Sequence, residues 1–230
     1  MSRILYIYKK KFKYENNKMS MENIIEIIEE LKNSPTKKII DSKMSDFSEL
    51  GEKSSNELFK ELCFCLLTAN FSANGGIKIQ NEIGDGFLTL SEGELAKKLF
   101  QLGHRFPNAR AKFISEAQRH KDTLKETLLA FSDDKSKRGW LVKDIKGLGM
   151  KEASHFLRNI GHKNVAIIDF HIVDFLVNQD LIERPKNKTL TPKRYFEIES
   201  LLKKIADKTN LSLGELDLYL WYKETGSVLK

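Results

Sequence analysis

Apolar residues recur along most of the chain every three or four positions, the spacing that places them on one face of an α-helix. One such face follows Ser20 and ends near Pro35, and a second, more strongly apolar one runs from Leu58 to Leu67. The sequences "SEGE" at 91–94 and "SLGE" at 212–215 have the spacing of a capping box, which marks a helix start. The full pattern predicts helices over residues 24–31, 58–67, 95–102, 107–120, 122–131, 134–144, 192–208 and 212–222.

No segment alternates between apolar and polar residues for long enough to predict a convincing strand, and "GFLTL" at 86–90 comes nearest. The two cysteines, Cys63 and Cys65, lie in the strongly apolar helix. We expect them in the core, because two thiols cannot supply a four-cysteine metal site. The fold class is therefore predicted to be all-α.

The chain has 230 residues and a net charge of +7, which is compatible with a polyanionic partner but also with a protein that is merely basic. No apolar stretch approaches the roughly 20 residues that span a bilayer, so no membrane association is expected. Free cysteines favour a reducing, cytoplasmic location. Residues 1–20 form a basic N-terminal extension, which a start at Met19 or Met21 would largely leave out.

The stretch "IKGLGMKEASHFL" at 145–157 predicts a helical hairpin over about 138–161. Gly147 and Gly149 can take positive φ and leave backbone N–H groups uncovered. With the N-terminus of the following helix, these groups would form a site for an anion such as a DNA phosphate. An ordinary αα-hairpin explains the glycines equally well.

Lys151 is the residue of the hairpin that favours a catalytic function over an ordinary turn. It falls in the first turn of the second helix, where the helix macrodipole disfavours a cation by a few tenths to about 1 kcal/mol. That position favours the uncharged amine that a lysine nucleophile needs. A surface contact with phosphate is the alternative.

These residues, followed by Asp169 and His171, resemble the helix-hairpin-helix signature of the endonuclease III superfamily of DNA glycosylases. Further resemblance lies in "KELCFCLLTANFS", "LGHRF", "RAKFI" and the terminal "LDLYLWYKETGSVLK", from about residue 50 to residue 230. These stretches are similar to the type 2 (archaeal and thermophile-type) 8-oxoguanine DNA glycosylase/lyases. At the position of Phe170 that subfamily would have a basic residue.

The resemblance implies one glycosylase domain over residues 21–230, with two helical subdomains and the active site in the cleft between them. It implies a monomer that acts on double-stranded DNA containing 8-oxoguanine or abasic sites, close to the nucleoid, without a metal or other cofactor. Lys151 would attack the sugar of a flipped nucleotide and Asp169 would stabilise the developing positive charge. Asp169 also follows an apolar run as a natural N-cap, a role compatible with catalysis.

The resemblance also suggests roles for side chains outside the hairpin. Asn70 matches the residue that fills the gap left by the flipped base, although a polar helix end explains it as well. Arg105 and Arg110 would meet phosphates or the orphaned base. Trp221 would stack on the flipped base, with Phe106 as a candidate for the other side.

The last residue, Lys230, would belong to the lesion-recognition site, where a frayed tail is the alternative. Among the histidines, His171 is expected to form structural hydrogen bonds, and His155 and His162 to be ordinary helix and turn residues. Two other functions remain open at this stage. One is an endonuclease III-like enzyme for oxidised pyrimidines, and the other is a helix-hairpin-helix module that binds DNA without catalysis.

Overall fold

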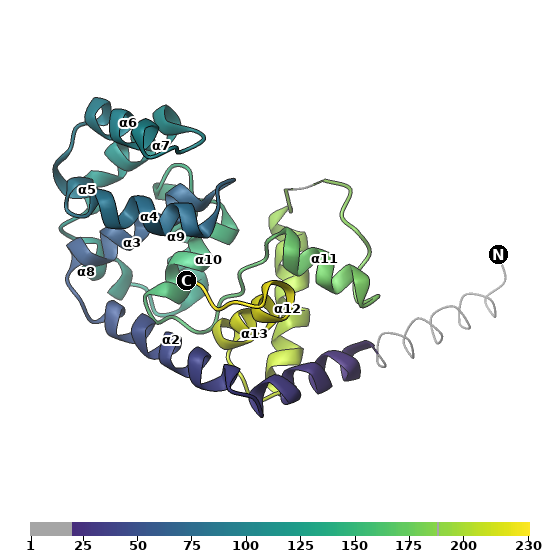
Figure 1. Ribbon diagram of the computed structural model, residues 1–230. Coiled ribbons are helices and arrows are strands. Elements are labelled where there is room, and N and C mark those ends of the chain that lie inside the picture. The colour runs from purple at the N-terminus through teal and green to yellow at the C-terminus, as the bar shows by residue number, and fades with distance from the viewer. Residues whose placement is uncertain (1–19, 188) are drawn as a thin grey trace. The chain divides into compact units, whose positions relative to one another are not determined.

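The predicted all-α fold is confirmed by a computed structural model, which describes residues 20–187 and 189–230 and has no β-strand among them (Figure 1). Nearly all of the basic extension expected at the N-terminus lies outside these residues. The described chain forms two compact units. The first contains residues 20–41 and Ile168–Val228, and the second contains Ser42–Ile167 and Leu229–Lys230.

The first unit is built from a helix over residues 20–32 and three later helices. These are α11 (Phe170–Asn178), α12 (Pro192–Lys208) and α13 (Leu213–Thr225). The predicted starts are confirmed: Thr191 caps α12 ahead of Pro192, and Ser212 and Glu215 form the capping box of α13. Helix α13 packs against α11 and α12.

The second unit contains most of the remaining helices, and α2 (Thr36–Gly51) contributes residues to both units. They are α3 (Ser55–Thr68), α4 (Ala73–Ile83), α5 (Gly86–Thr89), α6 (Glu92–Gln101), α7 (Pro107–Ala117), α8 (Leu124–Leu129), α9 (Asp134–Asp144) and α10 (Met150–Asn159). A short 3₁₀ helix over Gln118–His120 extends α7. In the stretch 86–90, the nearest approach to a strand pattern, Gly86–Thr89 form the short helix α5 and Leu90 is its C-cap.

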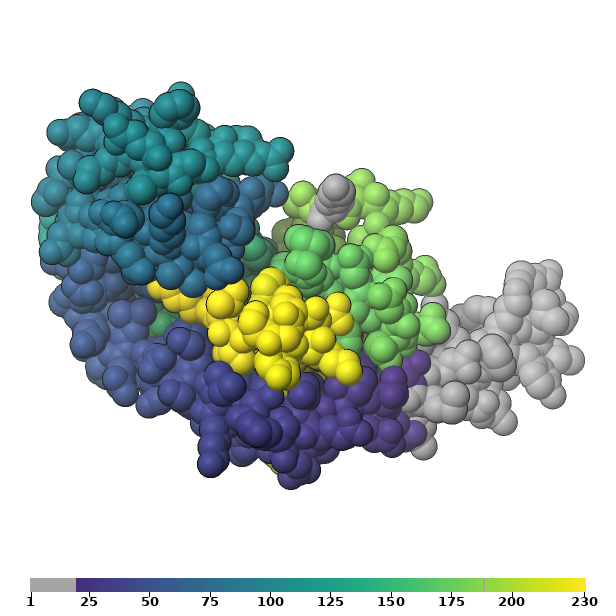
Figure 2. All heavy atoms as spheres, viewed as in Figure 1, coloured from purple at the N-terminus to yellow at the C-terminus, as the bar shows by residue number. Residues whose placement is uncertain are grey.

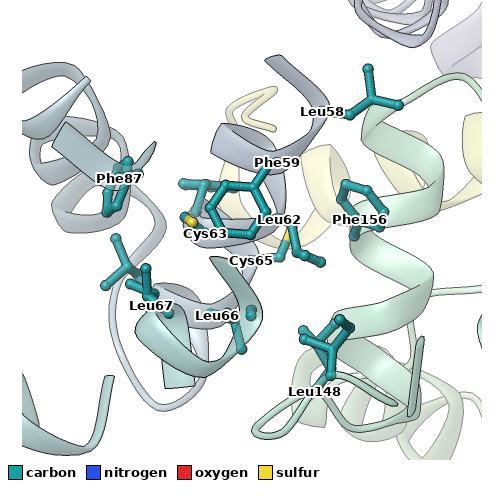
Figure 3. Close-up of a cluster of buried hydrophobic side chains, with 14 of the residues drawn as sticks. Leu58, Phe59, Leu62, Cys63, Cys65, Leu66, Leu67, Phe87, Leu148 and Phe156 are labelled. Carbon is teal, nitrogen blue, oxygen red and sulfur yellow. The ribbon is translucent and has the colours of Figure 1, made fainter. Parts of the chain in front are cut away.

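The core of the second unit surrounds α3, which is buried along nearly its whole length (Figure 3). Phe59, Leu62 and Phe156 are fully buried there, each contributing on the order of 1.5–3 kcal/mol by leaving water. Cys63 and Cys65 lie in the same core as free thiols, as predicted. Burial raises the pKa of both thiols well above its ordinary value.

Within residues 20–187 and 189–230, every helix is too short or too polar to cross a membrane.

Candidate active site

The predicted helical hairpin is present in the second unit. Helix α9 ends at Asp144, α10 begins at Met150, and residues 145–149 connect them. Leu148 points into the core and is 5 % exposed, while its N–H donates to the carbonyl of Ile145 at 3.2 Å. The buried leucine therefore anchors the turn between its two glycines.

Gly147 occupies a position that only glycine fits. Its φ is +93°, in the left-handed region where a Cβ is strained. A Cβ there would also lie 2.4 Å from a ring carbon of Phe113, too close for the ring to remain where it is. The prediction of positive φ is confirmed for this residue.

Gly149 departs from that prediction, because its φ is −93° and its ψ is −177°. It is the N-cap of α10 and carries no side-chain oxygen, so the first N–H groups of the helix receive no cap from it. Those N–H groups are the ones that bind an anion at a helix N-terminus. The expected anion site therefore depends on the missing side chain of Gly149 rather than on an unusual backbone angle.

Lys151 is the second residue of α10, as the sequence predicts. Its Nζ lies 3.7 Å from Oε1 of Glu152, and its side chain is 28 % exposed. Glu152 supplies the negative charge that the N-terminus of the helix favours, which offsets the unfavourable placement of the lysine. The amine is thus partly shielded from water and next to a carboxylate.

Asp169 is the N-cap of α11 in the first unit, as predicted. Its Oδ1 accepts a hydrogen bond from the N–H of Ile172 at 3.0 Å. Its second oxygen, Oδ2, makes no hydrogen bond within the described part of the chain. The capping bond fixes the carboxylate, and Oδ2 can face a positive charge.

An aromatic group lies beside Asp169 in the same unit. The ring of His171 meets the Trp221 ring edge-on at 5.2 Å and lies 3.9 Å from the ring of Phe170. The structure thus gives His171 ring contacts, where we expected hydrogen bonds. Nε1 of Trp221 is buried and has no hydrogen-bond partner among the described residues.

The turn after α3 carries Asn70, which is exposed and has a φ of +59°. Arg110 lies beneath this turn, 8 % exposed, and its Nη2 donates to the carbonyl of Ala69 at 2.6 Å. The expected contact of Arg110 with a phosphate or the orphaned base stays a prediction. Arg110 satisfies a carbonyl at the end of α3, directly before Asn70.

Phe106 and Arg105 lie in the loop before α7. Phe106 is 39 % exposed, and the guanidinium of Arg105 is 5.0 Å from the centre of its ring. The backbone N–H of Phe106 donates to Nδ1 of His104 at 3.0 Å, while Nε2 of His104 contacts the carbonyl of Leu67 at 3.0 Å. The buried imidazole of His104 therefore links this loop to the end of α3.

Lys230 is held by side chains of the second unit, so it is not a frayed tail. Its Nζ donates to Oε2 of Glu61 at 2.8 Å and also to Oε1 of Gln80, and it lies 4.2 Å from the centre of the Phe64 ring. His155 meets the same Phe64 ring edge-on, with 5.7 Å between the ring centres. Figure 2 shows α13 and the residues that follow it, in yellow, on this face of the molecule.

A family model described as 8-oxoguanine DNA glycosylase matches residues 40–211. The chain belongs to this family. A relative named 8-oxoguanine DNA glycosylase/AP lyase, from Korarchaeum cryptofilum, is 53 % identical over 212 residues, which is 92 % of this chain and 100 % of the relative. A relative of the same name from Thermotoga maritima is 43 % identical over 212 residues, 91 % of this chain and 100 % of the relative.

The solved structures that resemble this family member include one with bound DNA. It is the Methanocaldococcus jannaschii 8-oxoguanine glycosylase/lyase in complex with a 15mer DNA containing 8-oxoguanine. That structure is 54 % identical in sequence and has a TM-score of 0.87, covering 90 % of this chain and 99 % of the other. The 8-oxoguanine DNA glycosylase of Thermotoga maritima gives a TM-score of 0.85 at 42 % identity.

Four residues of this glycosylase have structural roles that the sequence did not reveal, namely Glu61, Gln80, His104 and His155. His155 was expected to be an ordinary helix residue, but it is buried, and burial is the main reason that its pKa falls well below its ordinary value. Its place one turn after Lys151 was readable from the sequence. Its contact with the Phe64 ring was not, because that partner lies far away along the chain.

Phe170 is a position where the sequence departs from the pattern of the subfamily that it resembles. Its side chain is 67 % exposed, and its ring lies against His171. A phenyl ring cannot form an ion pair with a phosphate, so this residue cannot make the contact that a basic side chain would make there.

Proposed function

We propose that this protein removes 8-oxoguanine from DNA and then nicks the resulting abasic site through a Schiff base on Lys151. The observation that carries the proposal is the placement of Lys151, which follows the hairpin turn within the first helical turn of α10 and is partly shielded from water. Membership of the 8-oxoguanine DNA glycosylase family and the names of the relatives support it. The glycosylase domain comprises residues 21–230.

The reaction uses Lys151 and Asp169 on one flipped nucleotide. The uncharged amine of Lys151 attacks C1′ of the deoxyribose, and the bond from C1′ to the base breaks, so that the base leaves with the electron pair and takes up a proton. The carboxylate of Asp169 stabilises the positive charge that develops on the sugar. The attached nitrogen loses a proton and forms a double bond to C1′ as the C1′–O4′ bond breaks and O4′ takes up a proton, which gives the Schiff base. Loss of a C2′ proton then breaks the C3′–O bond, which nicks the strand on the 3′ side.

Recognition of the lesion requires a hydrogen-bond acceptor, because oxidation turns N7 of guanine into an N–H donor. An acceptor left facing the lone pair of an undamaged N7 would cost about 1–3 kcal/mol. We assign this discrimination to the end of the chain at Lys230, and stacking on the flipped base to Trp221 and Phe106.

The partner is double-stranded DNA that contains 8-oxoguanine or an abasic site. The N-terminus of α10, which follows the turn, binds a backbone phosphate, Arg105 adds charge at the surface, and Asn70 fills the gap left by the flipped base. Arg110 supports this last role by holding the carbonyl of Ala69. The protein acts as a monomer on chromosomal DNA in the cytoplasm.

Borohydride trapping tests the proposal. Reduction should link the enzyme covalently to an 8-oxoguanine duplex, and Lys151→Gln should abolish both trapping and base release while changing DNA affinity by less than about threefold, because phosphate contacts supply most of the affinity. Lys146→Gln, a surface lysine paired with Glu116 just before the turn, is the matched control and should trap normally.

Trapping of the Lys151→Gln variant would show that another amine is the nucleophile. A panel of duplexes with oxidised pyrimidines separates the substrate classes. Faster release of an oxidised pyrimidine than of 8-oxoguanine would replace the proposed substrate while leaving the lysine chemistry intact.

A further inference from the structure

The carboxylate of Glu61 is the least expected charge in the second unit. It lies on α3, the central helix of the core, and its side chain is 3 % exposed. A buried carboxylate is costly unless hydrogen bonds and an opposite charge compensate for the loss of water. Its partners should therefore explain why it is there.

Three side chains satisfy Glu61. Nδ2 of Asn159, on α10, donates to Oε1 at 2.6 Å. Nε2 of Gln80, on α4, donates to Oε2 at 3.1 Å, and Nζ of Lys230 donates to the same oxygen at 2.8 Å. Lys230 alone among these three partners brings a charge, so it is the one that compensates the carboxylate.

The ammonium of Lys230 is in turn enclosed by the protein. It contacts Glu61, the amide oxygen of Gln80 and the face of the Phe64 ring. An ammonium has three donors and no acceptor, so a group with these contacts has little left to offer a base. The ammonium thus anchors the end of the chain, and this anchor also holds the main chain of Lys230 in place.

We propose that Glu61 is a positioning residue for lesion recognition: it anchors the Lys230 ammonium, and this fixes the main chain of the last residues in the place from which they read the base. The inference rests on the proposed role of Lys230. Glu61 touches neither the DNA nor the reacting atoms. Its influence is therefore confined to steps that need the base to be recognised.

Glu61→Gln tests this with little change in shape. The amide oxygen can still accept from Asn159, and Lys230 can withdraw into water because it follows the last helix, so the core should stay folded. Excision of 8-oxoguanine should fall about 10- to 100-fold, the equivalent of one charged hydrogen bond. Nicking of a pre-formed abasic site should stay within about threefold, since that substrate has no base to read.

Glu57→Gln is the matched control. Glu57 lies one turn earlier on α3 and pairs with Lys60 at 2.6 Å, with its side chain 43 % exposed. The same chemical change on the same helix should leave both reactions at the wild-type rate. A thermal melt of each variant confirms that the second unit remains folded.

A double-mutant cycle shows whether Glu61 acts through Lys230. Lys230→Met should slow 8-oxoguanine excision selectively, and adding Glu61→Gln to it should cause almost no further loss, because the contact is already gone. Multiplied losses in the double variant, equal losses on both substrates, or full excision by Glu61→Gln would each overturn the inference. If Lys230→Met itself left excision unchanged, the proposed role of Lys230 in recognition would fail instead.

Discussion

Asp169 has two roles that one substitution can separate. Asn and Asp are about equally good N-caps, so Asp169→Asn should keep the bond to the Ile172 N–H and change stability by less than about 0.5 kcal/mol. It removes the negative charge, however, and we expect base excision to fall by at least about 100-fold, as when another preorganised electrostatic group is lost. Single-turnover excision and urea unfolding of the same preparation measure the two effects.

Asp169→Ala is the complementary substitution for separating the two roles. It removes cap and charge together, so it should add a loss of about 1 kcal/mol in stability to the loss of activity. Full activity in Asp169→Asn would show that the carboxylate is only a cap.

The candidate site residues whose position in the fold could be predicted are those whose evidence is local. Lys151 and Asp169 stand next to their own helix starts, so their positions could be read from neighbouring residues. Arg110 could not be placed in this way, because the carbonyl that it holds is 41 residues away. The contact between Glu61 and Lys230 spans 169 residues, and a sequence pattern gives no sign of it.

At the scale of the elements, the two glycines of the hairpin turn should differ in how well they tolerate substitution. Gly147→Ala should destabilise the turn and lower DNA affinity, because its φ is +93° and the new Cβ would meet the Phe113 ring at 2.4 Å. We expect a loss of about 1–3 kcal/mol in stability, typical of strain combined with overpacking. Urea unfolding and titration of an abasic-site duplex are the measurements.

Gly149→Ala is the comparison within the same turn. Its φ is −93°, and the new Cβ would approach only the flexible end of the Glu152 side chain, at 3.1 Å. Stability should therefore change by less than about 1 kcal/mol. Equal destabilisation by the two substitutions would contradict this account of the turn.

Two helices with side-chain caps were predicted closely, and two other helices were missed. The expected ranges 134–144 and 192–208 coincide with α9 and α12. Helix α4 was missed because Gly75 and Gly76 fall in its first turns, although packing of Ile79 and Ile83 in the core outweighs their low helix propensity. Helix α2 was also missed, although Ile40, Met44 and Phe47 have helical spacing and are buried.

For the molecule as a whole, buried histidines should make stability depend on pH. Burial is the main cause of a lowered pKa for His104, His120 and His155, all of which lie in the second unit. The unfolded chain takes up protons near pH 6.5, whereas the folded chain does so only at lower pH. The free energy of unfolding should therefore fall as the pH drops below about 6.5.

His155 allows this prediction to be checked with one variant. Because it is buried, it should contribute up to about 1.4 kcal/mol for each pH unit below 6.5. His155→Gln should flatten the dependence by about that amount when urea unfolding is compared at pH 7.5, 6.5 and 5.5. Parallel curves for the two proteins would mean that other groups control the acid sensitivity.

The burial of Cys63 and Cys65 has a consequence for survival under oxidative stress. Peroxide attacks the thiolate form of cysteine. Cys63 and Cys65 have no exposed surface and a raised pKa, so almost no thiolate is present for peroxide to reach. After treatment with millimolar hydrogen peroxide, removal of the oxidant and unfolding, both thiols should still react with a thiol reagent, and loss of either would refute the expectation. The oxidant that creates 8-oxoguanine in the genome would then leave the cysteines of the protein intact.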